Sequence, residues 1–356
     1  MDNAGCKLSC ILGSFFLTLS RLLIPLTTIK SHIFILGTTL YPLGLSLYIP
    51  ALTFAIKKTT LGPMRSLAFS MFYASLTFGV FIGGPSIDYF RSNINNVEVS
   101  FAGMTTTLSA YGMLYLAGFI LTLFCFLLFF FFYKEIDLEE DSGINERAVI
   151  SNTGICQIYK DVLGDIKFWK YLFFAILTIG MKLVYVELSI MFPKILVEEF
   201  GQSTLYGMIL AISPIFICAW LFLTSPCTIN LDPFSQIVMG AFFNTFAPIP
   251  LLFGMTYFHI FIFIVFVSLG EALNAPKLYE FVFHFTRKGR EGMFLTLTAA
   301  PHYLTMAVSG LLSGYLLEEF FPDSGEKRLN LIWITLIASS AISLVLLIAF
   351  RKCFRP

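Results

Sequence analysis

Three ionisable residues, Arg21, Lys182 and Glu271, lie near the middle of long apolar stretches of this sequence. An ionised group inside a hydrocarbon layer costs several kcal/mol unless it faces a cavity or a partner, so such residues are the first candidates for a functional site. A guanidinium, an ammonium and a carboxylate near one depth could pair with one another or bind a charged substrate.

Glu271 is the strongest of these candidates. It follows Gly270 and precedes Pro276, two residue types that loosen or bend a helix and can expose backbone carbonyl groups to a cavity. A carboxyl group held away from water can take up a proton on one side of a membrane and release it when a cation approaches. We predict that Glu271 is a central proton or substrate site; the alternative is a structural glutamate that only accepts hydrogen bonds.

The two basic residues each have two interpretations. Lys182 is a counter-ion for Glu271 or for a substrate carboxylate, or else its side chain follows a helix bend toward water. Arg21 is expected to hold helices together through backbone carbonyl groups, with binding of a substrate anion as the alternative. Glu187, five residues beyond Lys182, is expected in an outer vestibule.

Uncharged polar residues could line the same cavity, although tyrosines are also common in apolar helices as packing groups. The candidates are Tyr48, Tyr73, Tyr185 and Asn274. A separate basic set is predicted to anchor helices at the cytoplasmic face and to grip acidic residues there when a gate closes: Arg65, Arg287, Lys288 and Arg290. No Cys/His group has zinc-like spacing, and we expect neither a metal nor a cofactor.

The composition places these residues in lipid. Of the 356 residues, 57% are hydrophobic and 13% are charged, and the mean hydropathy is +0.82. Because a soluble domain carries about 25% charged residues, an ordinary soluble or disordered chain is excluded. A net charge of +1 gives no field that would attract nucleic acid. The expected partners are the lipid bilayer, a small organic solute and protons, and not nucleic acid.

Ten apolar segments are long enough to cross about 30 Å of hydrocarbon. They are continuous runs without the alternation of a barrel strand, so we predict an all-α polytopic membrane protein. The predicted spans are residues 8–28, 33–56, 66–87, 109–133, 168–192, 204–224, 235–253, 257–285, 292–317 and 329–350.

The basic residues predict the topology. With the N-terminus in the cytoplasm, 15 Lys and Arg residues fall in cytoplasmic segments and five in outer loops, which follows the positive-inside rule. We therefore expect an integral multi-pass protein with cytoplasmic N- and C-termini. The long polar stretch 134–167 predicts a cytoplasmic linker between a four-helix bundle, 1–133, and a six-helix bundle, 168–356.

A weak internal repeat relates the two bundles. The pattern Gly-x5-Pro-x-Leu begins at Gly44 in the second predicted span and at Gly270 in the eighth. Each copy is followed by a basic pair and then by an arginine that opens the next helix. If both bundles are copies of one six-helix unit, the second span is its fourth helix, and the earlier bundle lacks its first two helices.

The residues before the first predicted span resemble a sequence motif of a known family. Asp2-x-x-Gly5-x-Lys7, directly before the first span, looks like the end of the loop motif of the major facilitator superfamily. Two bundles joined by a long cytoplasmic linker resemble that superfamily throughout. The segments that begin at Pro50 and Gly270 look most like proton-coupled, peptide-transporter-like members found in protists. The resemblance implies a two-bundle fold, which with the predicted spans has about ten helices, four plus six.

The resemblance also implies a function. Peptide-transporter-like members place a functional glutamate on the helix that corresponds to the one carrying Glu271. We therefore expect a monomeric secondary transporter of small organic solutes that works by alternating access and is coupled to protons. The alternative is a transporter-like receptor or scaffold that no longer transports, because a bundle without two helices loses part of its cavity wall. The spans carry no protease or phosphate-binding motif, so an enzyme is not expected.

Overall fold

The computed structural model describes residues 5–27, 29–60, 64–94, 97–101, 104–134, 163–228, 231–281, 285, 300–322 and 325–354. The chain divides into two compact units. The first comprises Met1–Arg65, Pro85–Thr153 and Arg287–Ala299. The second comprises Ser66–Gly84, Gly154–Thr286 and Ala300–Pro356. The helix α3 (Arg65–Asn93) therefore contributes most of its length to the second unit and its end to the first.

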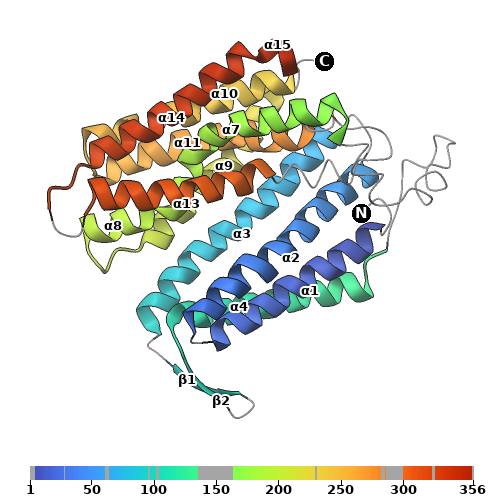
Figure 1. Cartoon of the computed structure of the whole chain (residues 1–356), viewed down its shortest axis with the longest axis vertical. Coiled ribbons are helices and arrows are strands. Elements are labelled where there is room, and N and C mark those ends of the chain that lie inside the picture. The colour runs from blue at the N-terminus through green and yellow to red at the C-terminus, as the bar shows by residue number, and fades with distance from the viewer. Residues whose placement is uncertain are drawn as a thin grey trace. The chain divides into compact units, whose positions relative to one another are not determined.

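The first unit is built around α1 (Gly5–Leu26), which packs against both α2 (Lys30–Thr59) and α4 (Ala110–Phe131) (Figure 1). Ser109 caps α4 by accepting a hydrogen bond from the backbone N–H of Gly112. None of the residues of α4 is buried, as expected for a helix with wide exposure to lipid.

A short hairpin follows α3, where the sequence predicts only a loop between the third and fourth spans. Strands β1 (Val97–Phe101) and β2 (Met104–Leu108) pair antiparallel, with Val97 opposite Leu108 and Phe101 opposite Met104. Valine recurs in the first strand and threonine in the second, and β-branched residues favour the extended backbone.

Close contact between α1 and α2 depends on two glycines. A Cβ atom on Gly13 would lie 2.8 Å from the backbone nitrogen of Tyr48, and one on Gly44 would lie 2.9 Å from the backbone nitrogen of Leu17. The carbonyl oxygen of each glycine also lies 3.0 Å from the Cβ position of the other. Backbones can approach so closely only where both helices lack a side chain.

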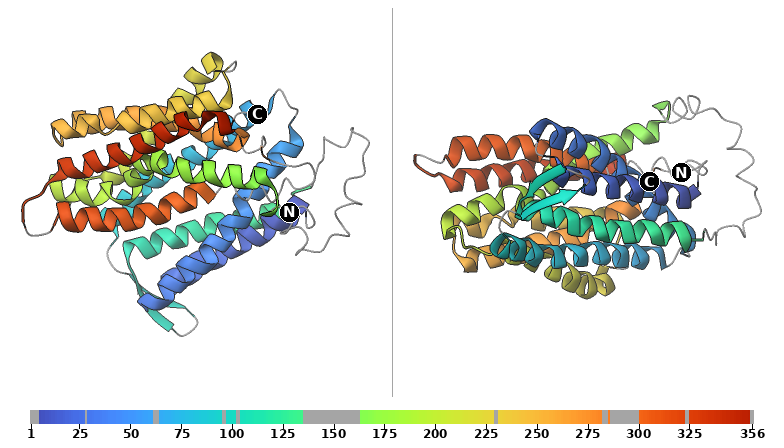
Figure 2. Two further views of the ribbon diagram at one scale, coloured as in Figure 1. Left: turned by 45° about the horizontal axis from the view of Figure 1, so that its top comes forward. Right: turned by 90° about the horizontal axis from the view of Figure 1, so that it is seen from below.

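The second unit contains the remaining helices, coloured green to red in Figure 2, which run side by side in both views. After α7 (Ile166–Ile190) come α8 (Phe192–Phe200) and α9 (Tyr206–Thr228). The helix α10 (Pro233–Phe246) is followed by a 3₁₀ turn, η3 (Ile249–Phe253). The chain then forms α11 (Tyr257–Phe281), α13 (Ala300–Phe320), α14 (Leu329–Ala349) and the short α15 (Arg351–Phe354).

The α10–α11 pair repeats the glycine contact of α1 and α2. A Cβ atom on Gly240 would lie 2.6 Å from the carbonyl oxygen of Gly270, and one on Gly270 would lie 2.8 Å from the carbonyl oxygen of Gly240. Gly44 and Gly270 open the two copies of the Gly-x5-Pro-x-Leu pattern. The repeated glycine thus occupies the same kind of close helix contact in each unit.

Nine helices within the described residues are long and apolar enough to cross a membrane. They match nine of the ten predicted spans. The seventh predicted span is α10 continued by η3, because Pro248 and Pro250 cannot donate the hydrogen bonds of a regular helix. The remaining predicted span, 292–317, overlaps α13, and its residues before Ala300 lie outside the described part.

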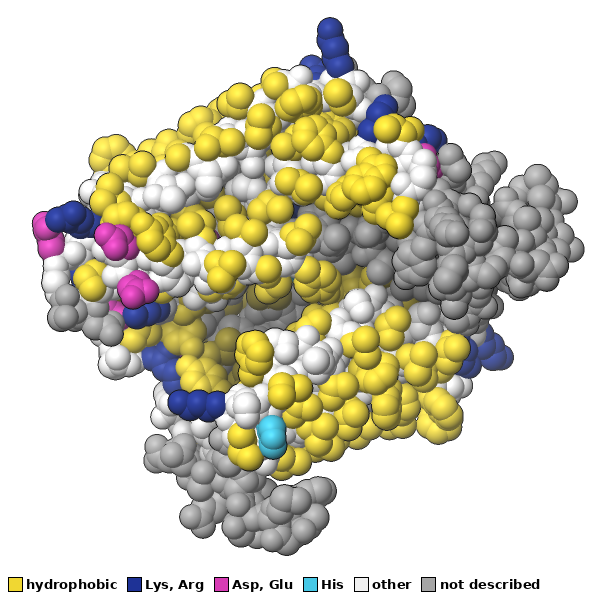
Figure 3. Space-filling model, in the orientation of Figure 1, with side chains coloured by type: hydrophobic (Ala, Val, Ile, Leu, Met, Phe, Trp, Pro, Cys, Tyr) yellow, Lys and Arg dark blue, Asp and Glu magenta, His cyan; other side chains and the backbone are white. Residues whose placement is uncertain are grey.

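The outward faces of the helices are apolar. Figure 3 shows hydrophobic side chains spread along them, whereas the described charged side chains gather near the helix ends. Leu311 is 81% exposed and Phe222 is 77% exposed, which is costly in water but not in hydrocarbon. The protein is an integral multi-pass membrane protein.

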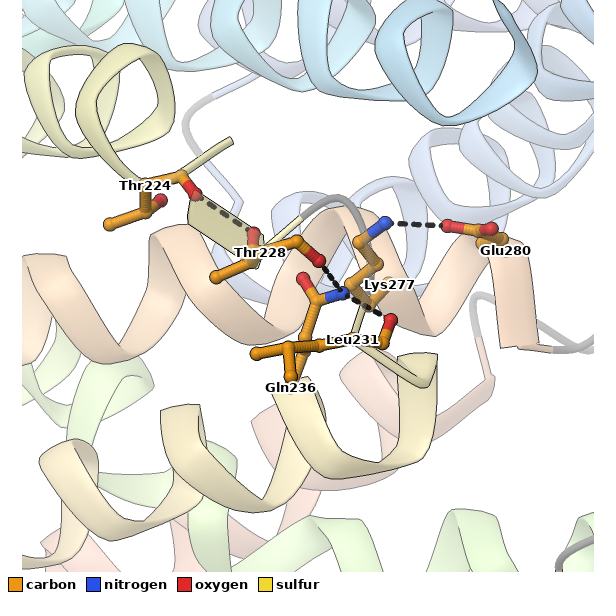
Figure 4. Close-up of polar contacts among 6 residues, drawn as sticks. All are labelled: Thr224, Thr228, Leu231, Gln236, Lys277 and Glu280. Atoms are coloured by element: carbon orange, nitrogen blue, oxygen red, sulfur yellow. Dashed lines mark hydrogen bonds and ion pairs between the residues drawn. The ribbon is translucent and has the colours of Figure 1, made fainter. Parts of the chain in front are cut away.

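One buried glutamine holds the turn from α9 to α10 (Figure 4). The side-chain amide of Gln236 donates hydrogen bonds to the carbonyl oxygens of Thr228, at 2.9 Å, and Leu231, at 3.0 Å. Both carbonyls belong to residues at or beyond the end of α9, and the Thr228 carbonyl also accepts a hydrogen bond of 2.9 Å from the backbone N–H of Leu231, so the side chain adds to the backbone bonding of this turn. In the same view, Lys277 and Glu280 form an ion pair of 2.8 Å near the end of α11.

The glycine contact gives a direct test of this packing. The Gly240→Ala variant is expected to lose about 1–3 kcal/mol of stability, because its methyl group would meet the backbone of α11, which cannot move aside cheaply. Thermal unfolding of the purified protein in detergent micelles measures this loss. Gly310→Ala is the matched control, since a Cβ atom there meets no described atom within 4 Å. Equal stability of the two variants would contradict the assigned packing.

Candidate functional site

An ion pair joins α7 and α11 inside the second unit. The Lys182 ammonium lies 2.8 Å from Oε1 of Glu271, and the two side chains are 8% and 2% exposed. The hydroxyl group of Tyr73, on the part of α3 that belongs to the second unit, donates a hydrogen bond of 2.7 Å to the same oxygen. Lys182 and Glu271, both predicted from the sequence, are thus in direct contact, and a third helix contributes a donor.

The local sequence brings these three side chains together. Gly270 lets α11 approach α10 closely, which fixes the rotation of α11 and therefore the direction of the neighbouring Glu271. Tyr73 is held by an apolar cluster made of α3, α9 and α11 residues, in which Ile217 and Ala272 are buried. At the start of α7, Asp165 accepts a hydrogen bond from the backbone N–H of Lys167 and caps the helix that carries Lys182.

Aromatic side chains surround this carboxylate. Tyr185, Trp220 and Tyr279 pack against the cluster around Tyr73. Tyr185 also shares a hydrogen bond with the Tyr73 hydroxyl, so Glu271, Tyr73 and Tyr185 form a chain of polar groups. The aromatic rings exclude water from the ion pair, and their faces and hydroxyl groups remain able to interact with a cation.

The charge balance at Glu271 determines what the site can do. Its Oε1 atom has both donors, whereas Oε2 is buried and has no hydrogen-bond partner among the described residues. A buried carboxylate is stabilised by a nearby cation, and removal of that cation leaves a large uncompensated cost. Loss of Lys182 from this contact would therefore have to be offset by another positive charge at the same carboxylate.

Asn274 lies about one helical turn beyond Glu271 and is fully buried at the contact with Gly240. Neither polar atom of its amide has a hydrogen-bond partner among the described residues. Asn244, which faces Gly270 from α10, donates a hydrogen bond of 3.5 Å to the carbonyl of Met181, the residue before Lys182. Both amides therefore place hydrogen-bonding atoms without a described partner close to the ion pair.

Two other predicted site residues lie in the first unit. The Arg21 guanidinium donates a hydrogen bond of 3.1 Å to the Gly118 carbonyl and packs against that glycine, where α1 meets α4. This contact is the packing role expected for Arg21. Tyr48 shares a hydrogen bond with Cys125 and meets Phe129 edge to face, with ring centroids 5.7 Å apart.

The predicted gate residues fall largely outside the described part of the chain. Arg287, Lys288 and Arg290 lie there, and of Arg65 only the backbone at the start of α3 is described. Within the described residues, no group of three or more His, Cys, Asp or Glu side chains could hold a metal ion.

Sequence reasoning misses part of the site. Trp220 and Tyr279 are not singled out by the sequence, and Tyr73 is only one of several tyrosines in the spans. A helix that is apolar on all sides gives no stripe that identifies the face meeting its neighbours. Glu187, expected in an outer vestibule, is instead 2% exposed and lies against α13.

Comparison with known proteins gives consistent results. The sequence matches the family model of the Major Facilitator Superfamily over residues 1–300. No curated protein matches the sequence. The fold is similar to that of a POT family transporter in complex with 5-aminolevulinic acid, with a TM-score of 0.71 and 12% identity, covering 99% of this chain and 82% of the other.

Two further solved structures show the same similarity of fold. One is XylE with two tryptophan substitutions, with a TM-score of 0.69 and 12% identity, covering 100% of this chain and 81% of the other. The second is a mutant of the peptide transporter POT in complex with sulfate, with a TM-score of 0.66 and 12% identity, covering 99% and 81%.

A double-mutant cycle tests the ion pair. Lys182→Met is expected to cost about 3–5 kcal/mol, because it leaves the Glu271 charge buried without its cation, and the double variant Lys182→Met/Glu271→Gln should recover most of that loss. Unfolding in micelles measures all four proteins. The more exposed pair Lys327–Glu198, 3.1 Å apart, is the control and should show a coupling of at most about 1 kcal/mol. Additive losses at Lys182 and Glu271 would show that they do not interact.

Proposed function

The chain belongs to the major facilitator superfamily and is a secondary transporter, and we propose that it couples proton movement to the passage of a small organic solute through a site centred on Glu271. The observation that carries this proposal is the buried Lys182–Glu271 ion pair with Tyr73 on the same carboxylate oxygen. Burying such a pair inside a membrane protein costs stability relative to an apolar pair of similar size, which would pack as well. Charged residues at this depth are therefore candidates for a functional role.

The proposed solute carries both an amino group and a carboxyl group. The amino group would replace the Lys182 ammonium at Glu271, and the carboxylate would then pair with the released Lys182. Tyr185 and Asn274 would line the same cavity as hydrogen-bonding groups. One solved neighbour supports this solute class, since it is in complex with 5-aminolevulinic acid.

The proposed cycle is alternating access. A four-helix bundle, 1–133, and a six-helix bundle, 168–356, would rock about the central site while the linker 134–167 joins them in the cytoplasm. Arg65, Arg287, Lys288 and Arg290 would close the cytoplasmic gate by pairing with acidic residues. In this proposal both termini are cytoplasmic, the transporter is a monomer, and Arg21 and Tyr48 support the cavity wall of the first bundle.

Transport by purified protein in liposomes tests the proposal. A panel of amino acids, dipeptides and simple amines is presented outside, and a pH-sensitive dye inside reports proton movement in either direction. At least one solute with an amino group should change the internal pH as it enters. Glu271→Gln should reduce the coupled uptake by about tenfold or more, equivalent to ~1.4 kcal/mol. The substitution removes the negative charge for which the proton and the amino group of the solute compete.

The control is Glu319→Gln, which changes an exposed carboxyl group at the end of α13 and should transport normally. Unchanged uptake in Glu271→Gln would remove this residue from the site. Absence of transport for the whole panel, with the protein folded and correctly inserted, would favour the receptor or scaffold alternative.

A further inference from the structure

A second carboxyl group is buried in the same helix as Lys182. Glu187 is 2% exposed and lies between α7 and α13. The hydroxyl group of Ser309, which is itself fully buried, donates a hydrogen bond of 2.7 Å to Oε1 of Glu187. The other carboxyl oxygen, Oε2, has no hydrogen-bond partner among the described residues.

Glu187 differs from Glu271 because it has no cation. The ammonium of Lys182 is bonded to Glu271, and no described Lys, Arg or His forms an ion pair with Glu187. Four described elements packed against α7 carry other ionisable residues. On α13 and α11 these are His302, Tyr303, Tyr315, Glu318 and Glu319, and Tyr257, His259, Lys277, Tyr279 and Glu280. On α8 and α15 they are Lys194, Glu198 and Glu199, and Arg351, Lys352 and Cys353. The helices α10 and α14 contain no ionisable residue.

Two serine hydroxyls of α13 lie at the Glu187 carboxyl group, but no cation of the described residues does. Ser313 also lies within hydrogen-bonding range of the Glu187 carboxyl group. The Ser313 hydroxyl donates its hydrogen to the Ser309 carbonyl oxygen one turn earlier in α13. The ionised form of Glu187 would be buried with the Ser309 hydroxyl as its donor but without a positive charge beside it, so the carboxylic acid is the less costly form in this dry contact.

The two carboxyl groups are separate in space as well as in chemistry. Glu187 follows Lys182 by five residues, which is about 7.5 Å along the helix axis and about 140° around it. Lys182 accordingly faces α11, where Glu271 lies, and Glu187 faces α13. Among the described residues, no hydrogen bond joins Ser309 or Ser313 to the ion pair.

We propose that Glu187 is a proton-binding site of this transporter, protonated in the conformation described and distinct from the Lys182–Glu271 pair. Separation of α7 and α13 by water would stabilise the carboxylate and release the proton, and return to the dry contact would bind it again. The use of this proton to drive a solute rests on the proposed function, but its binding at Glu187 does not.

Infrared spectroscopy of the full chain in liposomes tests proton binding without any solute. A protonated carboxyl group gives a C=O stretching band that shifts in D₂O. The spectrum of wild type minus that of Glu187→Gln is expected to contain such a band, and the band should persist when the comparison is repeated in a Glu271→Gln background. Ser309→Ala, which keeps Glu187, should raise the frequency of the band because the C=O group loses its donor.

Two outcomes would overturn the proposal: a wild type minus Glu187→Gln spectrum without a carboxylic acid band, or a band whose frequency is the same in Ser309→Ala as in wild type. Size-exclusion profiles establish that each variant is folded. If Glu187→Gln fails to fold, the Ser309→Ala comparison alone decides the result. A Glu187 band together with no transport in the liposome panel would overturn the proposed function and leave this inference standing.

Discussion

The burial of the Glu271 charge constrains much of the second unit. An ionised carboxylate inside the hydrocarbon region must meet a cation and hydrogen-bond donors, because no water is available to solvate it. Those partners come from two other helices, Lys182 on α7 and Tyr73 on α3. The rotations and heights of three helices must therefore agree closely, and a small slip of any one of them would leave a charge unpaired.

Glycine contacts supply the rigidity that this alignment requires. Between α10 and α11, the two backbones touch at Gly240 and Gly270, and large side chains are excluded there. Glu271 follows Gly270 directly, so its direction is determined by backbone contact and not by flexible side-chain packing. In the first unit, the residue after Gly44 is the apolar Leu45, although the same kind of glycine contact is present. The glycine contact therefore forms whether or not a charged residue follows it, and in α11 it positions the charge of Glu271.

The sequence is sufficient to predict most of the spans and to single out both members of the ion pair. Hydropathy is a local property, so the long helices follow from it, and the cost of a charge in hydrocarbon singles out Lys182 and Glu271 at mid-span. Tyr73 and Trp220 cannot be singled out in this way, because α3 and α9 are apolar on most sides and only tertiary packing decides which face meets a neighbour. The expectation for Glu187 is wrong for a related reason: its position along α7 suggests the outer end, but its rotation turns it toward α13.

The presence of two carboxyl groups in different surroundings bears on how coupling can work. In the proposed function a proton and a substrate ammonium would both neutralise Glu271, so if that residue were the only site, the two would compete and would bind in turn. A separate proton at Glu187 would allow the proton and the solute to be bound at once. The two carboxyl groups have different partners, because Ser309 donates to Glu187, whereas Lys182 and Tyr73 donate to Glu271. Competition favours exchange of the two across the membrane, and joint occupancy favours their movement in the same direction. The arrangement of hydrogen bonds around Glu187, more than the central ion pair, therefore bears on the direction of coupling.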